Sequence, residues 1–179
     1  LWLGVLTLFL YVGVEVIAID TLGLYAETQG ISKAIAPMLG TFSLITLTIG
    51  YLLGIVFVPK YINQSKALAL SAILGIVFAT FAIITQGMTS IIFIILLSFA
   101  HAMMWPSIWP LSIDKLGSHT ALGSALLIMA IAGGAILPLL YGSFVDLLGG
   151  DRQLPYIMLL PCYAMIFYFS IWGHKVGKK

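Results

Sequence analysis

The stretch ALALSAILGIVFATFAIITQ, residues 67–86, contains no Asp, Glu, Lys or Arg. An α-helix needs about 20 mostly apolar residues to cross the hydrocarbon core of a bilayer, and this stretch is long enough to do so. Comparable apolar runs recur along the rest of the chain. We therefore predict six membrane-spanning helices, at residues 2–25, 37–58, 67–86, 91–113, 120–145 and 155–173.

The overall composition indicates that lipid is the main solvent of this protein. Of its 179 residues, 61% are hydrophobic and 8% are charged, whereas soluble domains carry about a quarter charged residues. The apolar runs recur throughout, so they are structure and not a removable signal peptide. We expect an all-α polytopic membrane protein, with one domain over residues 1–179. Because Leu1 already lies inside an apolar run, we expect a fragment or processed half of a longer protein.

Several classes of function are disfavoured by the same composition. A net charge of +2 with scattered Lys residues does not form the basic stripe of a nucleic-acid binder. A lone Cys162 allows no disulfide or thiolate metal site within the chain, and a lone His101 is a poor metal ligand. An intramembrane hydrolase would need a nucleophile beside a base, and neither H-E-x-x-H nor G-x-S-x-G occurs in the sequence. We expect no enzyme activity, no metal and no cofactor.

Positive charges are unevenly divided between the two ends of the predicted bundle. Six crossings put both ends of the chain on one side, and cytoplasmic loops are enriched in Lys and Arg. One side holds Lys60, Lys66, Lys115, Lys175, Lys178 and Lys179, and the other holds Lys33 and Arg152. This distribution predicts that both ends are cytoplasmic.

Glu15 is the charged residue that interrupts the first apolar run, from Val5 to Ile19. A carboxylate near the bilayer centre costs about 2.5–3.5 kcal/mol on insertion scales, so we expect a compensating environment. On a helix Tyr11 and Glu15 share a face, which we expect to point into the bundle. We interpret Glu15 as a residue that binds substrate or carries a proton. The alternative is a neutral, hydrogen-bonded packing residue.

The fourth predicted crossing gathers polar and aromatic groups on one face. Spacings of three or four residues place these side chains within an arc of about 80°. A sugar ring has polar edges and apolar C–H faces, so its site needs hydrogen-bonding groups beside flat aromatic rings. We predict that this stripe binds a sugar, although tryptophans also anchor helices at membrane interfaces. Its members are Ser98, His101, Trp105, Trp109 and Ser112.

Two prolines, Pro106 and Pro110, interrupt the same crossing. Each lacks a backbone donor and clashes with the preceding turn, so we predict a break or kink there that serves gating. Broken helices at membrane depth usually line cavities. Small residues elsewhere, such as Gly50 and Gly54, predict close helix packing.

A weak internal repeat relates the two halves of the chain. Residues 19–23 (IDTLG) end the first crossing, and residues 113–117 (IDKLG) end the fourth. A three-plus-three inverted repeat, the arrangement by which many carriers place a site at the midplane, would account for this similarity.

Three segments of the chain also carry a resemblance to a known family of carriers. They are residues 11–16 (YVGVEV), residues 104–109 (MWPSIW), and residues 116–124 with 129–138 (LGSHTALGS and MAIAGGAILP). Together they resemble the fucose, galactose and glucose proton symporters of the major facilitator superfamily. There they look like the seventh helix with its intramembrane glutamate, the tenth helix, and the eleventh helix with the loop before it.

This resemblance implies that the chain is the last six helices of a twelve-helix carrier of the bacterial inner membrane. Its expected function is proton-coupled transport of a fucose-, glucose- or galactose-class monosaccharide by alternating access, together with the missing N-terminal six helices. In the family the acidic residues most tied to proton coupling belong to that other half, which implies that Glu15 shapes the sugar site. The resemblance also implies gating by the loop around Gly54, Pro59 and Lys60. Tyr51 stands where relatives often have arginine.

A third class of protein is an alternative to a carrier. A non-transporting assembly subunit would use small-residue helix faces to pack against other helices. Such a subunit would place its glutamate and tryptophans against protein or lipid, whereas a carrier places them beside an aqueous cleft.

Overall fold

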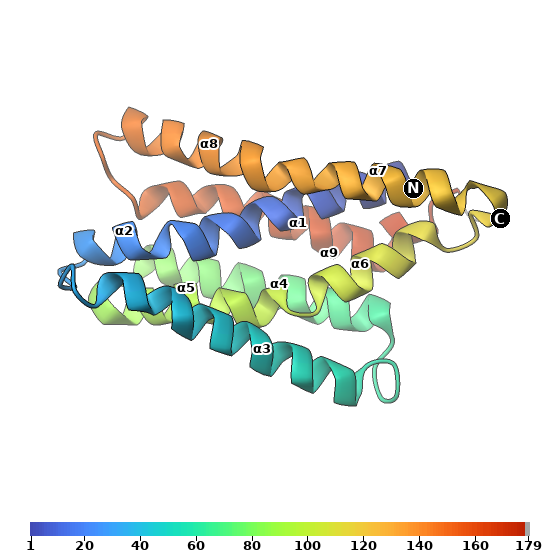
Figure 1. Cartoon of the computed structure of the whole chain (residues 1–179), viewed down its shortest axis with the longest axis horizontal. Coiled ribbons are helices and arrows are strands. Elements are labelled where there is room, and N and C mark those ends of the chain that lie inside the picture. Colours follow the sequence, from blue (N-terminus) through green and yellow to red (C-terminus); the bar gives the residue numbers. More distant parts are fainter. Residues whose placement is uncertain (178–179) are drawn as a thin grey trace.

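The computed structural model describes residues 1–177 and shows a bundle of long helices that lie roughly along one direction (Figure 1). The charges of Lys178 and Lys179, which entered the orientation prediction, lie outside the described residues. In chain order, with η for a 3-10 helix, the elements are α1 Trp2–Asp20, α2 Leu22–Thr28, η1 Ala36–Met38, α3 Leu39–Phe57, α4 Gln64–Ile84, α5 Gly87–His101, α6 Met104–Ile113, η2 Gly117–His119, α7 Thr120–Met129, η3 Ala130–Ala132, α8 Gly133–Leu147, η4 Leu154–Met158, α9 Leu159–Ile171 and η5 Gly173–Lys175.

These elements form six apolar segments long enough to cross a bilayer. The shortest has 18 residues and the longest has 31, and at 1.5 Å per residue the 19 residues of α1 extend about 28 Å, close to the hydrocarbon thickness. The predicted all-α fold with six membrane segments is therefore confirmed. The segments are Trp2–Asp20, Ala36–Phe57, Gln64–Ile84, Gly87–Ile113, Gly117–Leu147 and Leu154–Ile171.

The first segment differs from the continuous helix expected over residues 2–25. The helix α1 ends at Asp20 and α2 begins at Leu22. Between them the Thr21 hydroxyl donates to the Ile17 carbonyl at 2.6 Å and lies 2.7 Å from the Tyr156 hydroxyl. Threonine hydroxyls that bond to the preceding turn bend helices, so this contact accounts for the change of axis.

The helix α1 lies at the centre of the bundle, in contact with α5, α6, α8 and α9. Glycine lets it approach α8 closely: a Cβ on Gly133 would lie 1.9 Å from the Phe9 carbonyl oxygen. On the other helix, a Cβ on Gly13 would lie 2.5 Å from the Leu137 side chain. This close packing holds the polar residues of α1 at a fixed depth in the bundle.

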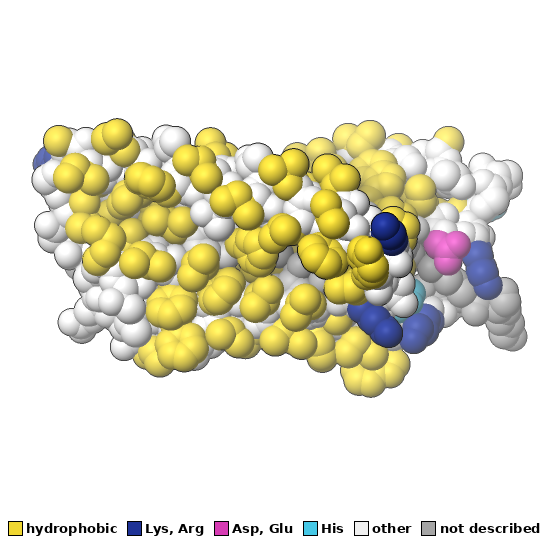
Figure 2. Space-filling model, turned by 90° about the horizontal axis from the view of Figure 1, so that it is seen from below, with side chains coloured by type: hydrophobic (Ala, Val, Ile, Leu, Met, Phe, Trp, Pro, Cys, Tyr) yellow, Lys and Arg dark blue, Asp and Glu magenta, His cyan; other side chains and the backbone are white. Residues whose placement is uncertain are grey.

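The helix α3 lies at the edge of the bundle, mainly against α5. Its buried residues, Leu39, Ser43, Gly50 and Gly54, form one narrow stripe, and the remaining surface of the helix is largely apolar. Hydrophobic side chains cover this side of the molecule over most of its length, and Lys and Arg side chains gather near one end (Figure 2). This pattern is typical of a lipid-facing or helix-facing surface between two polar ends.

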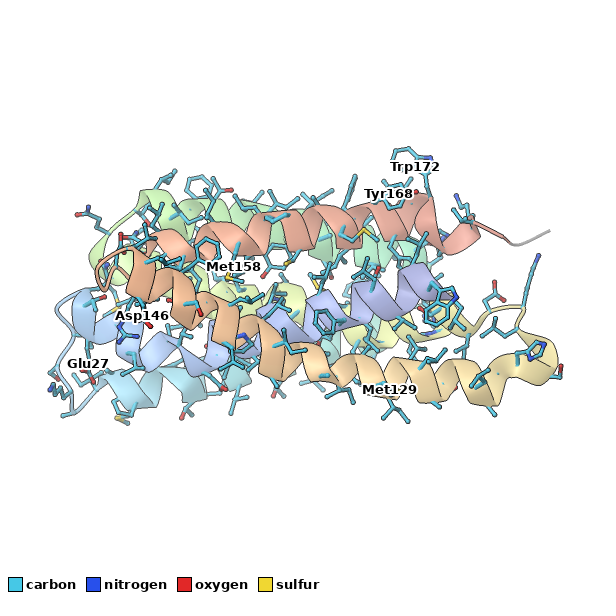
Figure 3. All side chains as sticks on the ribbon, turned by 90° about the horizontal axis from the view of Figure 1, so that it is seen from above. Glu27, Met129, Asp146, Met158, Tyr168 and Trp172 are labelled. Atoms are coloured by element: carbon cyan, nitrogen blue, oxygen red, sulfur yellow. The ribbon has the colours of Figure 1, made fainter. Side chains whose placement is uncertain are left out.

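The two ends of the bundle have different contents. The helix α1 begins and α9 ends at the same end (Figure 1), whereas Glu27 and Asp146 lie at the opposite end (Figure 3). At that opposite end the Gln153 amide donates to the carbonyls of Ala82 at 2.9 Å, Ile83 at 3.1 Å and Thr85 at 2.5 Å. Because these carbonyls belong to the last turn of α4, the glutamine caps that helix.

The two segments of the weak internal repeat also lie at opposite ends. Asp20 is the last residue of α1, and Asp114 caps the end of α6. The helices α1 and α6 finish at different ends of the bundle (Figure 1). This placement agrees with an inverted relationship between the two halves.

Candidate functional site

The fourth membrane segment is broken between α5 and α6. The helix α5 ends at His101, and α6 starts at Met104. Pro106 cannot donate to the carbonyl four residues earlier, at Ala102, and its ring clashes with that carbonyl, so the break at Ala102 and Met103 lies where Pro106 requires it. Pro110 lies inside α6, and its missing donor falls opposite Pro106. The predicted break is present, one turn before Trp105.

Trp105 and Trp109 form a stacked pair just beyond this break. Their ring centroids are 5.9 Å apart and their planes differ by 21°. With Pro106 and Pro110 they line an open groove of about 420 Å³, and both indoles are half-buried. The groove therefore presents flat apolar surfaces that remain accessible on one side.

Tyr11 of α1 joins this aromatic pair to the interior. Its ring meets Trp105 edge-on at 6.2 Å and meets His101 edge-on at 6.1 Å. Edge-to-face contacts of this length are favourable between aromatic rings. The predicted site residues Tyr11, His101 and Trp105 are therefore brought together from α1, α5 and α6.

Glu15 lies one turn beyond Tyr11 on α1 and is half-buried. The Tyr11 hydroxyl lies within interaction distance of the Glu15 carboxyl and of the Tyr51 hydroxyl from α3. Among residues 1–177, tyrosine hydroxyls are the polar side-chain groups that act on this carboxyl. Glu15 thus belongs to a cluster of hydroxyl groups on α1 and α3, which offers hydrogen bonds at a depth where water is scarce.

His101 is fully buried between α5 and α9. Its Nε2 lies 2.7 Å from the Tyr163 hydroxyl, and the two rings are 5.8 Å apart. Its Nδ1 has no hydrogen-bond partner among the described residues. The imidazole therefore reaches the groove only through its contact with Tyr11, so it is an interior group and not a groove-lining one.

The serines predicted to belong to the same stripe lie elsewhere. Ser98 is fully buried, and its hydroxyl has no partner in the described part of the chain. The Ser112 hydroxyl donates to the Ile108 carbonyl at 2.6 Å and packs against Gly4 of α1. The expectation that all five residues present one accessible face was wrong. The break at Met103 and the packing of α5 and α6 on other helices leave only the two indoles partly accessible.

The residues predicted to serve gating surround the connection between α3 and α4. Gly54 accommodates the Met103 side chain, because a Cβ there would lie 2.0 Å from the Met103 sulfur. The Val58–Pro59 peptide bond is cis. The Lys60 amine is exposed and lies 5.2 Å from the centre of the Tyr61 ring. Two of these features, the glycine and the cis proline, therefore lie close to the break in the fourth segment.

Two residues that interact with the site were not predicted as part of it. Tyr51 reaches Tyr11 and Glu15 from α3, and Tyr163 reaches His101 from α9. In the described part of the chain, no group of three or more His, Cys, Asp or Glu side chains is arranged to hold a metal ion.

The chain is similar to bacterial sugar transporters over nearly its whole length. It is 32% identical to the glucose/galactose transporter of Brucella abortus over 176 residues, which is 97% of this chain and 42% of that protein. It is 30% identical to the L-fucose-proton symporter of Haemophilus influenzae over 182 residues, which is 98% of this chain and 42% of that protein. The chain thus spans about two fifths of the length of these curated relatives.

The fold is also that of a solved transporter. The crystal structure of the major facilitator superfamily transporter FucP in the outward conformation matches with a TM-score of 0.89 and 26% identity, over 94% of this chain and 41% of that chain. The matching part is the C-terminal half of FucP. No protein-family model matches the sequence. The relatives and the fold together confirm the resemblance stated from the sequence: the chain belongs to the major facilitator superfamily, in the family of glucose/galactose transporters and L-fucose-proton symporters.

Proposed function

We propose that this chain forms the C-terminal half of a secondary carrier that moves a monosaccharide across the membrane by alternating access. The observation that carries this proposal is the convergence of Glu15, Tyr11 and Tyr51 beside the stacked indoles of Trp105 and Trp109. Three helices contribute to this cluster. The named activities of the relatives support the same class of substrate.

Recognition of a sugar uses the two kinds of surface at this site. The indole faces of Trp105 and Trp109 cover the apolar C–H face of a pyranose ring. The hydroxyls of Tyr11 and Tyr51 and the carboxyl of Glu15 bond the hydroxyls at the ring edge. Charge-assisted hydrogen bonds from a carboxylate are stronger than neutral ones, so Glu15 contributes most to affinity and to the choice between sugar epimers.

Transport is coupled to protons, and Glu15 shapes the sugar site without carrying the coupled proton. Its neighbours among the described residues are hydroxyl groups that a sugar can replace or join. The coupled proton moves through acidic groups of the six helices that complete the carrier. Under this proposal, the loss of the Glu15 charge weakens sugar binding and leaves the response to a proton gradient in place.

The chain is oriented in the bacterial inner membrane with both ends in the cytoplasm. Lys60, Lys66, Lys115 and Lys175 belong to the end at which α1 begins, and Lys33 and Arg152 belong to the other. An excess of basic residues marks the cytoplasmic side. The outer apolar face of α3 then lies against the N-terminal six helices of the same carrier or against lipid.

The test is uptake of labelled glucose, galactose and L-fucose into proteoliposomes that contain the intact transporter. We expect uptake by the wild type and a marked loss of uptake in both Glu15→Gln and Trp109→Ala. Wild-type protein that is folded but takes up none of these sugars would reject the proposed function. Uptake that is unchanged in both variants would reject the site assignment and favour a packing role for these residues.

A further inference from the structure

A second cavity lies between α3 and α6, on the side of Tyr51 away from the aromatic groove. It has a volume of about 190 Å³, and its walls include the α3–α4 connection and the start of α6. A buried water needs about 10–15 Å³ of such volume, so the cavity can hold several waters or a small polyol. The residues used below are Tyr51, Gly54, Pro59, Gln64, Pro106 and Ser107.

Ser107 supplies this cavity with a buried hydroxyl that has no partner. The side chain is 1% exposed, and its oxygen forms no hydrogen bond within the described residues. Other hydroxyls in these helices bond to the preceding turn, as Ser112 does to Ile108 at 2.6 Å and Thr46 does to Phe42 at 2.7 Å. An unsatisfied buried polar group costs about 1–3 kcal/mol, so a partner from outside the chain is the natural complement of Ser107.

The walls of the cavity combine polar and apolar surfaces. The Tyr51 side chain, the Gln64 amide and the Ser107 hydroxyl provide donors and acceptors, and Pro59 and Pro106 provide apolar surfaces. A few convergent polar groups in an otherwise apolar pocket are typical of small-molecule sites. This mixture suits a ligand with hydroxyls around an apolar ring.

Tyr51 connects this cavity to the site around Glu15. Its hydroxyl lies within interaction distance of the Tyr11 hydroxyl, and the same side chain forms part of the cavity wall. A ligand that leaves the Glu15 site therefore needs to pass only one side chain to enter the cavity. The cavity lies toward the end at which α1 begins, which is the cytoplasmic end under the proposed orientation.

We infer that this cavity is a second monosaccharide site, which the sugar occupies on the cytoplasmic side of Tyr51 before release. The inference rests on the proposed function. Gly54, Pro59 and Pro106, three of the residues predicted to serve gating, line the same cavity. A movement of the α3–α4 connection relative to α6 changes the volume of the cavity, so the site is emptied as the carrier opens to the cytoplasm.

The test compares the two faces of the intact transporter. Sugar transport is measured from the cytoplasmic face in inside-out membrane vesicles and from the opposite face in right-side-out vesicles. For Ser107→Ala we expect the cytoplasmic-side KM to rise about fivefold to tenfold, the effect of one lost hydrogen bond. We expect the KM from the opposite face to stay within about twofold. Ser107→Thr, which keeps the hydroxyl, should restore much of the loss.

Ser43→Ala is the matched control, because Ser43 is also fully buried on α3 with an unpartnered hydroxyl but does not line this cavity. Its KM should not change on either face. If Ser107→Ala does not fold, Gln64→Ala replaces it, with the same asymmetric change expected.

Two outcomes separate this inference from the proposed function. Equal KM values on both faces for the Ser107 and Gln64 variants, in a transporter that Glu15→Gln inactivates, would show that the cavity holds water only and would overturn the second site. A wild-type protein that transports no monosaccharide would instead overturn the proposed function on which the inference rests.

Discussion

The Tyr11 ring lies edge-on to the Trp105 indole, with 6.2 Å between the ring centroids. Through this contact the central helix α1 meets the segment that follows the break in the fourth crossing. One turn along α1 lies Glu15, and one turn along α6 lies Trp109, which stacks on Trp105. The carboxyl and the indole pair are thus held in one cluster by a single tyrosine.

Trp109→Ala removes half of the stacked pair. We predict that it raises the KM for sugar uptake about tenfold, because the loss of one aromatic contact costs ~1.4 kcal/mol. Trp109→Phe should keep much of the affinity. The matched control is Trp172→Ala: Trp172 is 59% exposed and lies at the far end of α9, away from the bundle interior (Figure 3). An equal loss in both alanine variants would contradict a specific role for Trp109.

Glu15→Gln replaces the carboxylate by a neutral group of the same size. We predict a rise in the sugar KM of about tenfold or more, since hydrogen bonds to charged groups contribute ~1.5–3 kcal/mol. Uptake at saturating sugar should still increase when an inward proton gradient is imposed. The measurement is uptake with and without that gradient. Residual uptake that ignores the gradient would instead assign the coupled proton to Glu15.

Gly133→Ala tests the close approach of α1 and α8. A Cβ at this position would lie 1.9 Å from the Phe9 carbonyl oxygen, so the two helices must separate, and we expect a lower melting temperature of the purified transporter. The control is Gly142→Ala on the same helix, where a Cβ meets nothing within 4 Å and alanine favours the helix by ~0.5–1 kcal/mol. A melting temperature that falls equally in both variants would show that α8 tolerates no side chain added at either glycine, whatever it packs against.

Tyr163→Phe removes the hydroxyl that bonds His101. The imidazole would then be buried with neither nitrogen paired among the described residues, which costs about 1–3 kcal/mol. We predict a lower melting temperature and a change in uptake smaller than that of Trp109→Ala. Tyr168→Phe, on the exposed side of α9, should leave both unchanged. A larger effect on sugar KM than on stability would place Tyr163 in the binding site itself.

Much of the fold follows from features that are local in the sequence. The six crossings depend on apolar length alone, and the break before Met104 depends on the missing donor of Pro106 four residues later. The pairing of Trp105 with Trp109 follows from a spacing of four residues on one helix. Glu15 is likewise distinguished by its position within an apolar run, because a membrane-embedded carboxylate is costly.

The rest of the candidate site depends on contacts between distant helices. Tyr51 and Tyr163 lie on α3 and α9, and nothing in their own segments distinguishes them from other tyrosines until those helices pack against α1 and α5. The periodicity of the fourth crossing predicts Ser112 beside the indoles, but the approach of Gly4 on α1 turns that serine into a packing contact. The assignment of Glu15, Tyr11, Ser98, His101, Trp105 and Trp109 to sugar binding stays a prediction.

Equilibrium binding tests most directly whether the carboxyl and the indoles serve one sugar. The dissociation constant of a labelled monosaccharide is measured on the purified intact transporter for the wild type, Glu15→Gln, Trp109→Ala and the double variant. We predict that each single change weakens binding about tenfold and that the double change weakens it by less than the product of the two, since both residues hold the same ligand. Wild-type affinity in both single variants would contradict the shared site.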